Sequence, residues 1–145
     1  MKEEIKKNCD ALRKSSKLET EEDFDQYLES IEYLKKHQSP EVLVEMFLSL
    51  SDVDAGEIQY ELVEACEEYE EELYVSKFME LSTNIKRNSP FWGELMLCSI
   101  LNTPSCARIL INKFNSQGND SLYCWIKDLA IKNPDYKKII KRIEK

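Results

Sequence analysis

The stretch that decides the fold class runs from residue 88 to residue 104 and reads NSPFWGELMLCSILNTP. It is bracketed by two pairs, Ser89-Pro90 and Thr103-Pro104. A serine or threonine side chain caps a helix by accepting a hydrogen bond from a first-turn amide, and proline suits the first helical position because no amide hydrogen is needed there. Each pair therefore predicts a helix start, and Trp92, Leu95 and Met96 form an apolar stripe between the two starts.

The pairing of a capping residue with proline recurs outward along the chain, at Ser39-Pro40 and Asn133-Pro134, and Thr20 with Asp23 indicates one more start. Between the starts, apolar residues recur at spacings of three and four, as a helix buried on one side requires. We expect about nine helices with these stripes: Ile5, Cys9, Leu12; Phe24, Tyr27, Leu28, Ile31, Leu34; Leu43, Met46, Phe47, Leu50; Ile58, Leu62, Ala65, Cys66, Tyr69; Tyr74, Phe78, Leu81, Ile85; Trp92, Leu95, Met96, Ser99; Cys106, Ile109, Leu110, Phe114; Leu122, Trp125, Ile126, Leu129; and Ile139, Ile140, Ile143.

Short connections join these helices, so consecutive helices should pack antiparallel. Residues 39–69, 73–101 and 103–131 then form three stacked pairs, preceded by helices within residues 1–38. A chain of 145 residues suits one domain, 1–145, and its three glycines and four prolines disfavour a sandwich or barrel. The predicted fold is all-α, an irregular stack of antiparallel helical hairpins that resembles a HEAT-like α-solenoid.

The chain shows no sign of a membrane or secretory segment. No apolar run approaches the roughly eighteen residues of a membrane span, and the first residues, MKEEIKKNCDALRKSS, are charged. We therefore expect a cytoplasmic protein. The five cysteines form no CxxC pair and mostly fall on apolar stripes, which favours reduced, buried thiols.

The net charge of −8 is distributed unevenly. Residues 1–20 carry six basic and four acidic groups, residues 21–80 three basic and nineteen acidic, and residues 81–145 eleven basic and five acidic. So acidic a middle segment repels nucleic acid and anionic lipid and attracts a cationic partner. We interpret the lysine-rich carboxyl end as structural, because cations there favour the helix dipole.

Common catalytic and metal-binding patterns are missing from the sequence. His37, the one histidine, lies in a polar Lys35–Gln38 segment at a helix end, where a solvated histidine is expected. One histidine and scattered thiols supply no zinc ligand set, and the three glycines lie too far apart for a phosphate-binding loop. The run EEYEEE at residues 67–72 lacks the pattern of an EF-hand loop. We expect no enzyme activity, no metal and no cofactor.

The predicted helix from Asp54 to Tyr69 is the most acidic element. At about 100° per residue, its apolar positions share a buried face and Tyr60, Val63 and Glu67 point directly away from it. One flank carries Glu57, Glu61, Glu64 and Glu68. Like charges at these spacings destabilise a helix by a few tenths of a kcal/mol per pair, and folding gains nothing in return.

A destabilising charge pattern without a folding benefit indicates a surface shaped for a partner, although an acidic helix can also serve solubility alone. Carboxylates would orient a basic ligand, and Tyr60 and Tyr74 would supply rigid aromatic contacts. The predicted partner-binding residues are Asp52, Asp54, Glu57, Tyr60, Glu61, Glu64, Glu67, Glu68, Glu71 and Tyr74.

From Leu73 onward, the stretch LYVSKFMELSTNIKRNSPFWGELMLCSILNTPSCARILINKF resembles the bacterial immunity protein 30 family of polymorphic-toxin and contact-dependent growth inhibition systems. The resemblance spans about half of the chain. It rests on a Ser-Pro-x-Trp cap followed by a helix that ends in an Ile-Leu-Asn turn: Ser89, Pro90, Trp92, Ile100, Leu101 and Asn102. The lysine-rich end and the two amino-terminal helices depart from the family's usual pattern.

This resemblance implies an all-helical, cytoplasmic protein that neutralises a toxin domain. Such toxins are often nucleases and therefore basic, which agrees with the acidic middle segment. The predicted mechanism is occlusion of the toxin's cationic groove in a complex of one monomer with one toxin, without nucleic acid or membrane. A helical-repeat adaptor that binds a peptide or protein is the alternative, and a toxin gene next to this one would separate the two.

Overall fold

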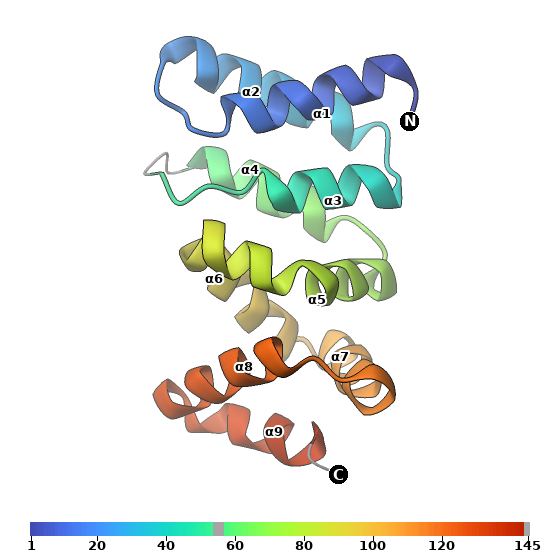
Figure 1. The fold of residues 1–145 in the computed structure, drawn as a ribbon, viewed down its shortest axis with the longest axis vertical. Helices are drawn as coiled ribbons and strands as arrows, with labels where there is room; N and C mark the ends of the chain where they lie inside the picture. The colour runs from blue at the N-terminus through green and yellow to red at the C-terminus, as the bar shows by residue number, and fades with distance from the viewer. Residues whose placement is uncertain (54–56, 144–145) are drawn as a thin grey trace.

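The computed structural model, which describes residues 1–53 and 57–143, consists of helices and connecting turns (Figure 1). Within these residues there are nine α-helices and one 3-10 helix, and no strand, which confirms the all-α prediction. In chain order they are α1 (Glu3–Ser15), α2 (Glu21–Lys35), α3 (Pro40–Leu48), α4 (Glu57–Glu67), α5 (Glu71–Asn88), α6 (Pro90–Asn102), α7 (Pro104–Gln117), α8 (Asp120–Lys132), η1 (Pro134–Tyr136) and α9 (Lys137–Ile143).

All four prolines begin a helix, as predicted. Ser39 Oγ accepts a hydrogen bond from the Val42 amide at 3.2 Å, and Asn133 Oδ1 accepts one from the Asp135 amide at 3.2 Å. The Thr20 hydroxyl caps α2 in the same way by accepting from the Asp23 amide at 3.1 Å. Local sequence therefore sets these starts, because each cap satisfies an amide only two or three residues away.

The caps predicted at Ser89 and Thr103 are wrong, although helices do start there. The Ser89 hydroxyl donates to the Ile85 carbonyl at 3.3 Å, and the Thr103 hydroxyl donates to the Ser99 carbonyl at 2.8 Å. Each of these residues directly follows one helix and precedes the next, so it lies as near to the last carbonyls of the first helix as to the first amides of the second. The side chains satisfy the carbonyls instead.

The helices stack along the long axis of the molecule, with the two termini at opposite ends (Figure 1). α1 packs on α2, α3 on α4 and α5 on α6, and the layers meet where α1 contacts α3, α2 contacts α4 and α3 contacts α5. The predicted pairs 39–69 and 73–101 are therefore present. The predicted pair 103–131 is looser. Phe114 of α7 meets Tyr123 of α8 at a ring-centroid distance of 6.4 Å, but α7 packs mainly on α5, α6 and α9, whereas α8 packs mainly on α5, η1 and α9. The chain turns by 99° between α6 and α7.

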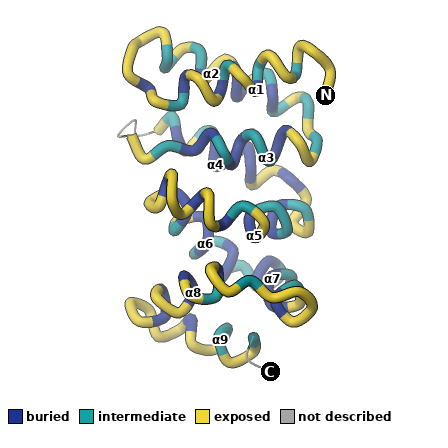
Figure 2. Tube along the Cα trace, in the orientation of Figure 1, coloured by how far each residue is buried: buried dark blue, intermediate teal, exposed yellow. Residues whose placement is uncertain are grey.

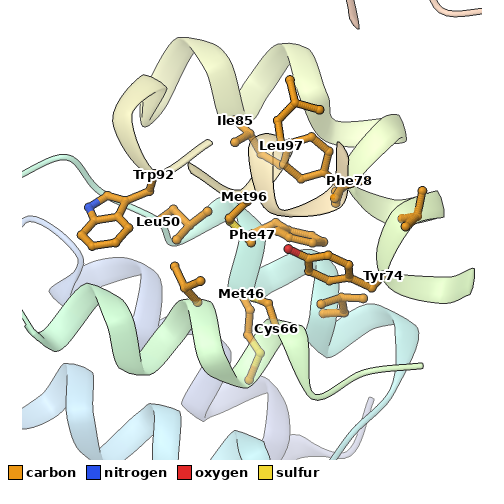
Figure 3. Packing of buried hydrophobic residues seen from close by; sticks show 14 of the residues in the cluster. Met46, Phe47, Leu50, Cys66, Tyr74, Phe78, Ile85, Trp92, Met96 and Leu97 are labelled. Carbon is orange, nitrogen blue, oxygen red and sulfur yellow. The ribbon is translucent and has the colours of Figure 1, made fainter. Parts of the chain in front are cut away.

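One hydrophobic cluster runs through the stack from Cys9 in α1 to Tyr136 in η1. Figure 2 shows buried residues on the faces where helices meet and exposed residues on the outer faces and turns. Phe47 of α3 meets Phe78 of α5 at a ring-centroid distance of 6.0 Å (Figure 3). Phe78 also stacks on Trp125 of α8 at 6.1 Å. These aromatic contacts join layers that are far apart in sequence.

Gly93 lets α6 approach α5 and α8 closely. A Cβ atom at this position would lie 2.7 Å from Ile85 Cγ2 and 3.0 Å from Trp125 Cη2, closer than carbon atoms normally pack. The absence of a side chain therefore helps to set where α6 lies, and α6 forms one wall of the candidate site described below.

Among the described residues, no single helix has the length and hydropathy needed to cross a membrane. The bent pair α6 and α7 meets both criteria when its two helices are taken together. The cysteines are all free: Cys9, Cys66 and Cys106 are buried, Cys98 is half-buried and Cys124 is exposed. Most of the thiols are therefore buried, as predicted.

Candidate functional site

α4 and Glu68, the residue directly after it, present an outward-facing row of carboxylates. Glu57, Glu64 and Glu68 are exposed and Glu61 is partly exposed, and none of the four has an ion-pair partner among the described residues. Elsewhere among the described residues, five acidic side chains have ion-pair partners, as Glu72 has Lys113 at 2.9 Å between α5 and α7. Unpaired like charges on one helix face repel one another, so this row keeps its full potential for a cationic partner.

The buried arc of α4 is wider than the sequence pattern predicts. Val63, predicted to point directly away, is only 3% exposed, and Tyr69 is buried but lies beyond the end of the helix. The reason is that α4 is covered from two directions: α2, α3 and α5 pack on one side, and residues of α6 approach the side that carries Val63. The four glutamates consequently point outward, and Tyr60 and Glu67 lie at the edge next to α6.

A cleft of about 320 Å³ lies between α4 and α6. Tyr60 is 51% exposed at its edge, where its ring meets Trp92 at 5.4 Å, and Leu95 is 40% exposed on the opposite wall. The neighbouring Phe91 is 62% exposed and contacts Trp92 at 5.1 Å. The lining residues are Tyr60, Val63, Glu67, Leu95, Met96, Cys98, Ser99 and Asn102. Exposed aromatic and aliphatic area therefore lies directly beside the acidic row, an arrangement typical of protein interfaces.

A smaller pocket of about 120 Å³ adjoins this cleft, with Glu67 and Ser99 lining both. Its other lining residues are Tyr69, Glu71, Tyr74, Ile100, Thr103 and Cys106. The Ser99 hydroxyl donates to Glu67 Oε2 at 3.3 Å, and Glu71 Oε2 accepts from the Ser105 hydroxyl at 3.0 Å. Both carboxylates are thus held toward α6 and α7.

Tyr74, predicted as a surface contact, is instead part of the core. Its side chain is 5% exposed, and its ring meets Phe47 at 5.7 Å (Figure 3). Burial raises the pKa of its phenol well above the ordinary value, and the negative charge of Glu67 raises it further. The apolar stripe Tyr74, Phe78, Leu81 and Ile85 already placed this tyrosine on the buried face of its helix, and the packing of α3 against α5 covers it.

Asp52, also predicted as a contact, caps a helix that begins 38 residues later in the chain. Its Oδ2 accepts from the Phe91 amide at 2.8 Å and its Oδ1 from the Trp92 amide at 3.4 Å. These bonds supply the cap that Ser89 does not. No local signal could have indicated this role, because the two ends meet only in the folded chain. Asp54, another predicted contact, lies outside the described residues.

Two other hollows differ from this site in charge. One, of about 330 Å³ between α5 and α8, is lined by Lys86 and Arg87, and Lys86 Nζ lies 5.6 Å from the Trp125 ring centre. The other, of about 340 Å³ between α1 and α2, carries Lys14 together with Glu22 and Asp23. A basic partner is therefore best matched by the α4–α6 surface, where the charged lining residues are acidic.

The remaining candidates for chemistry have structural surroundings. The His37 ring stacks on Tyr33 at 4.3 Å, and its Nδ1 lies 2.9 Å from the Tyr33 carbonyl. Within the part of the chain that the structure describes, no three His, Cys, Asp or Glu side chains are grouped as a metal site would require.

The family model named Immunity protein 30 matches residues 14–110, which is more than half of the chain. The match includes α2 but only the last two residues of α1, so the predicted departure from the family is wrong for the second amino-terminal helix, while nearly all of the first lies outside the match. It also contains the whole α4–α6 surface, whereas the lysine-rich end lies outside it. Comparison with curated proteins and with solved structures gives no match. The chain therefore belongs to the Immunity protein 30 family and is an immunity protein against a toxin.

Proposed function

We propose that the chain neutralises its toxin by covering a basic active groove of the toxin with the outer face of α4 and the adjoining α4–α6 cleft. In this proposal the toxin is a nuclease. The observation that carries this proposal is the row of four glutamates without ion pairs beside exposed Tyr60, Leu95 and Phe91. The carboxylates would occupy positions where the toxin holds phosphates, and the apolar side chains would fill the contact around them.

The energetics support a division of labour between these two kinds of residue. Exposed carboxylates attract a cationic partner over a distance of about one Debye length and so speed association. Aromatic and aliphatic contacts exclude water and slow dissociation. In this proposal one monomer binds one toxin in the cytoplasm over roughly 1,600 Å² of total buried surface, a common size for tight complexes, and needs no cofactor.

The decisive experiment reverses two charges on α4. Glu61→Lys together with Glu64→Lys should weaken binding to the toxin domain encoded beside this gene by at least about tenfold, or about 1.4 kcal/mol. Titration calorimetry measures the affinity, and growth of cells that express the toxin measures protection. Circular dichroism should show unchanged helix content, because neither side chain is fully buried.

A matched control changes the same total charge far along the stack. Asp128→Lys with Asp135→Lys alters two exposed residues of α8 and η1 and should leave affinity and protection nearly unchanged. Equal loss in both double variants would mean that net charge alone matters. Unchanged affinity in the α4 variant would remove this face from the interface. For the nuclease assignment, the toxin domain should cleave nucleic acid, and this chain should block that cleavage.

A further inference from the structure

The small pocket beside the α4–α6 cleft contains a buried polar group without a partner. The Tyr74 hydroxyl is inaccessible to solvent and makes no hydrogen bond with the residues that the structure describes, although the side chain lines the pocket. A buried hydroxyl that forms no hydrogen bond destabilises a fold, and most such groups in native proteins have a partner. This hydroxyl therefore indicates a polar group that the free chain does not itself supply.

Two carboxylates line the same pocket as this tyrosine. Glu67 and Glu71 are exposed, whereas the Tyr74 side chain is only 5% exposed. Ser99 holds Glu67, and Ser105 and Cys106 hold Glu71, with the Cys106 thiol 3.4 Å from Glu71 Oε2. The carboxylates thus have hydrogen-bond donors that orient them but no described cation that neutralises them.

We propose that this pocket receives one cationic side chain of the partner, an arginine or a lysine, whose charged end lies between Glu67 and Glu71 and donates a hydrogen bond to the Tyr74 hydroxyl. This inference rests on the proposed function, because it names the group through which the toxin engages the acidic surface.

Charge and size both favour this occupant. The pocket lining contains two carboxylates and no lysine, arginine or histidine, so an anion would be repelled. A volume of about 120 Å³ equals the liquid-phase share of about four water molecules, which suits a guanidinium or ammonium group with part of its alkyl stem. It is well below the roughly 300 Å³ or more of a small-molecule site. Charge-assisted hydrogen bonds in such a partly buried site are stronger than neutral ones.

The test uses the whole chain and small probes in place of the toxin. Butylguanidinium and butylammonium represent the two side chains, and butylurea is a neutral control of similar shape. Amide NMR titration should show saturable shifts at Ser99, Tyr74 and Cys106 with both cations and none with butylurea. The proposal would be overturned if neither cation caused saturable shifts, or if butylurea caused shifts equal to those of the cations.

Three variants locate the bound cation. Glu71→Gln should weaken binding of butylguanidinium about tenfold or abolish it. Glu64→Gln removes the same charge from the outer face of α4 and should change binding less than about twofold, since exposed charges at a distance are screened. Equal weakening in these two variants would show a diffuse electrostatic attraction rather than a pocket, and would overturn the proposal.

Tyr74→Phe tests the hydroxyl. If the hydroxyl has no partner in the free chain, the variant should unfold at an equal or higher temperature while binding butylguanidinium more weakly. A lower Tm would show that the hydroxyl is already satisfied, and unchanged binding would show that it does not contact the cation; either result contradicts the proposal. Since no toxin is present, failure here leaves the α4 charge-reversal test of the proposed function unaffected.

Discussion

Replacing Asp52 by alanine should destabilise the protein, because this side chain caps α6 from the connection between α3 and α4. It accepts hydrogen bonds from the Phe91 amide at 2.8 Å and the Trp92 amide at 3.4 Å. Ser89, the residue in the usual capping position, donates to the Ile85 carbonyl instead and cannot compensate without a rotation. The first-turn amides of α6 would then lose their side-chain acceptor.

The magnitude follows from the two effects that Asp52 combines. Loss of a helix cap costs about 1 kcal/mol, and loss of a negative charge at a helix amino terminus costs about 0.3–1 kcal/mol when exposed. We therefore expect Asp52→Ala to lower the free energy of unfolding by about 1–2 kcal/mol. Asp52→Asn retains an acceptor oxygen without the charge, so it should lose less than the alanine variant.

Urea unfolding followed by circular dichroism measures both variants. Glu64→Ala is the control, because that side chain is exposed on α4 and has no hydrogen bond or ion pair among those found in the described residues; its stability should change by less than about 0.5 kcal/mol. The reasoning would be refuted if Asp52→Ala were as stable as the parent protein.

Two further predictions concern packing and thiol reactivity. Gly93→Ala should lower the free energy of unfolding by about 1 kcal/mol, as measured by urea unfolding. Overpacking against Ile85 and Trp125 costs about 1–3 kcal/mol, which outweighs the gain of about 1 kcal/mol in helix propensity from alanine. A stabilised variant would contradict the close approach of α6. In the folded protein, iodoacetamide should label exposed Cys124 first and Cys66 last, because burial raises the pKa of the Cys66 thiol and blocks access to it. Peptide mass spectrometry after labelling measures the order, and early labelling of Cys66 would contradict its burial.

Helix positions were predictable because their signals are local. Proline at 40, 90, 104 and 134 begins a helix in each case, and Thr20 caps α2 through an amide three residues away. The family resemblance was also predictable, although the match extends over residues 14–110 and thus includes α2 to α6. Both depend on contiguous residues, whose propensities and spacing are visible without knowledge of the fold.

The candidate site was only partly predictable, because burial depends on which neighbour covers a given face. Helical periodicity placed Tyr60 outward and Tyr74 on a buried stripe, and they are 51% and 5% exposed, so the selection of Tyr74 as a contact residue is the error. Val63 was placed on the outer face but is covered from the α6 side. Leu95 and Phe91 were not predicted as site residues, although the structure shows both exposed. For Phe91, the signal available in the sequence was an apolar residue directly after the proline that begins a helix.

The sequence by itself determined that the chain forms short amphipathic helices, where most of them begin, and that the middle segment is acidic. Only the tertiary structure decided that the four glutamates in and directly after α4 face outward, that Asp52 caps α6, and that Glu67 and Glu71 line one pocket with the buried Tyr74. The physical reason is distance along the chain. Helix formation depends on hydrogen bonds between residues up to four apart, whereas the surface is defined by contacts between helices that are tens of residues apart.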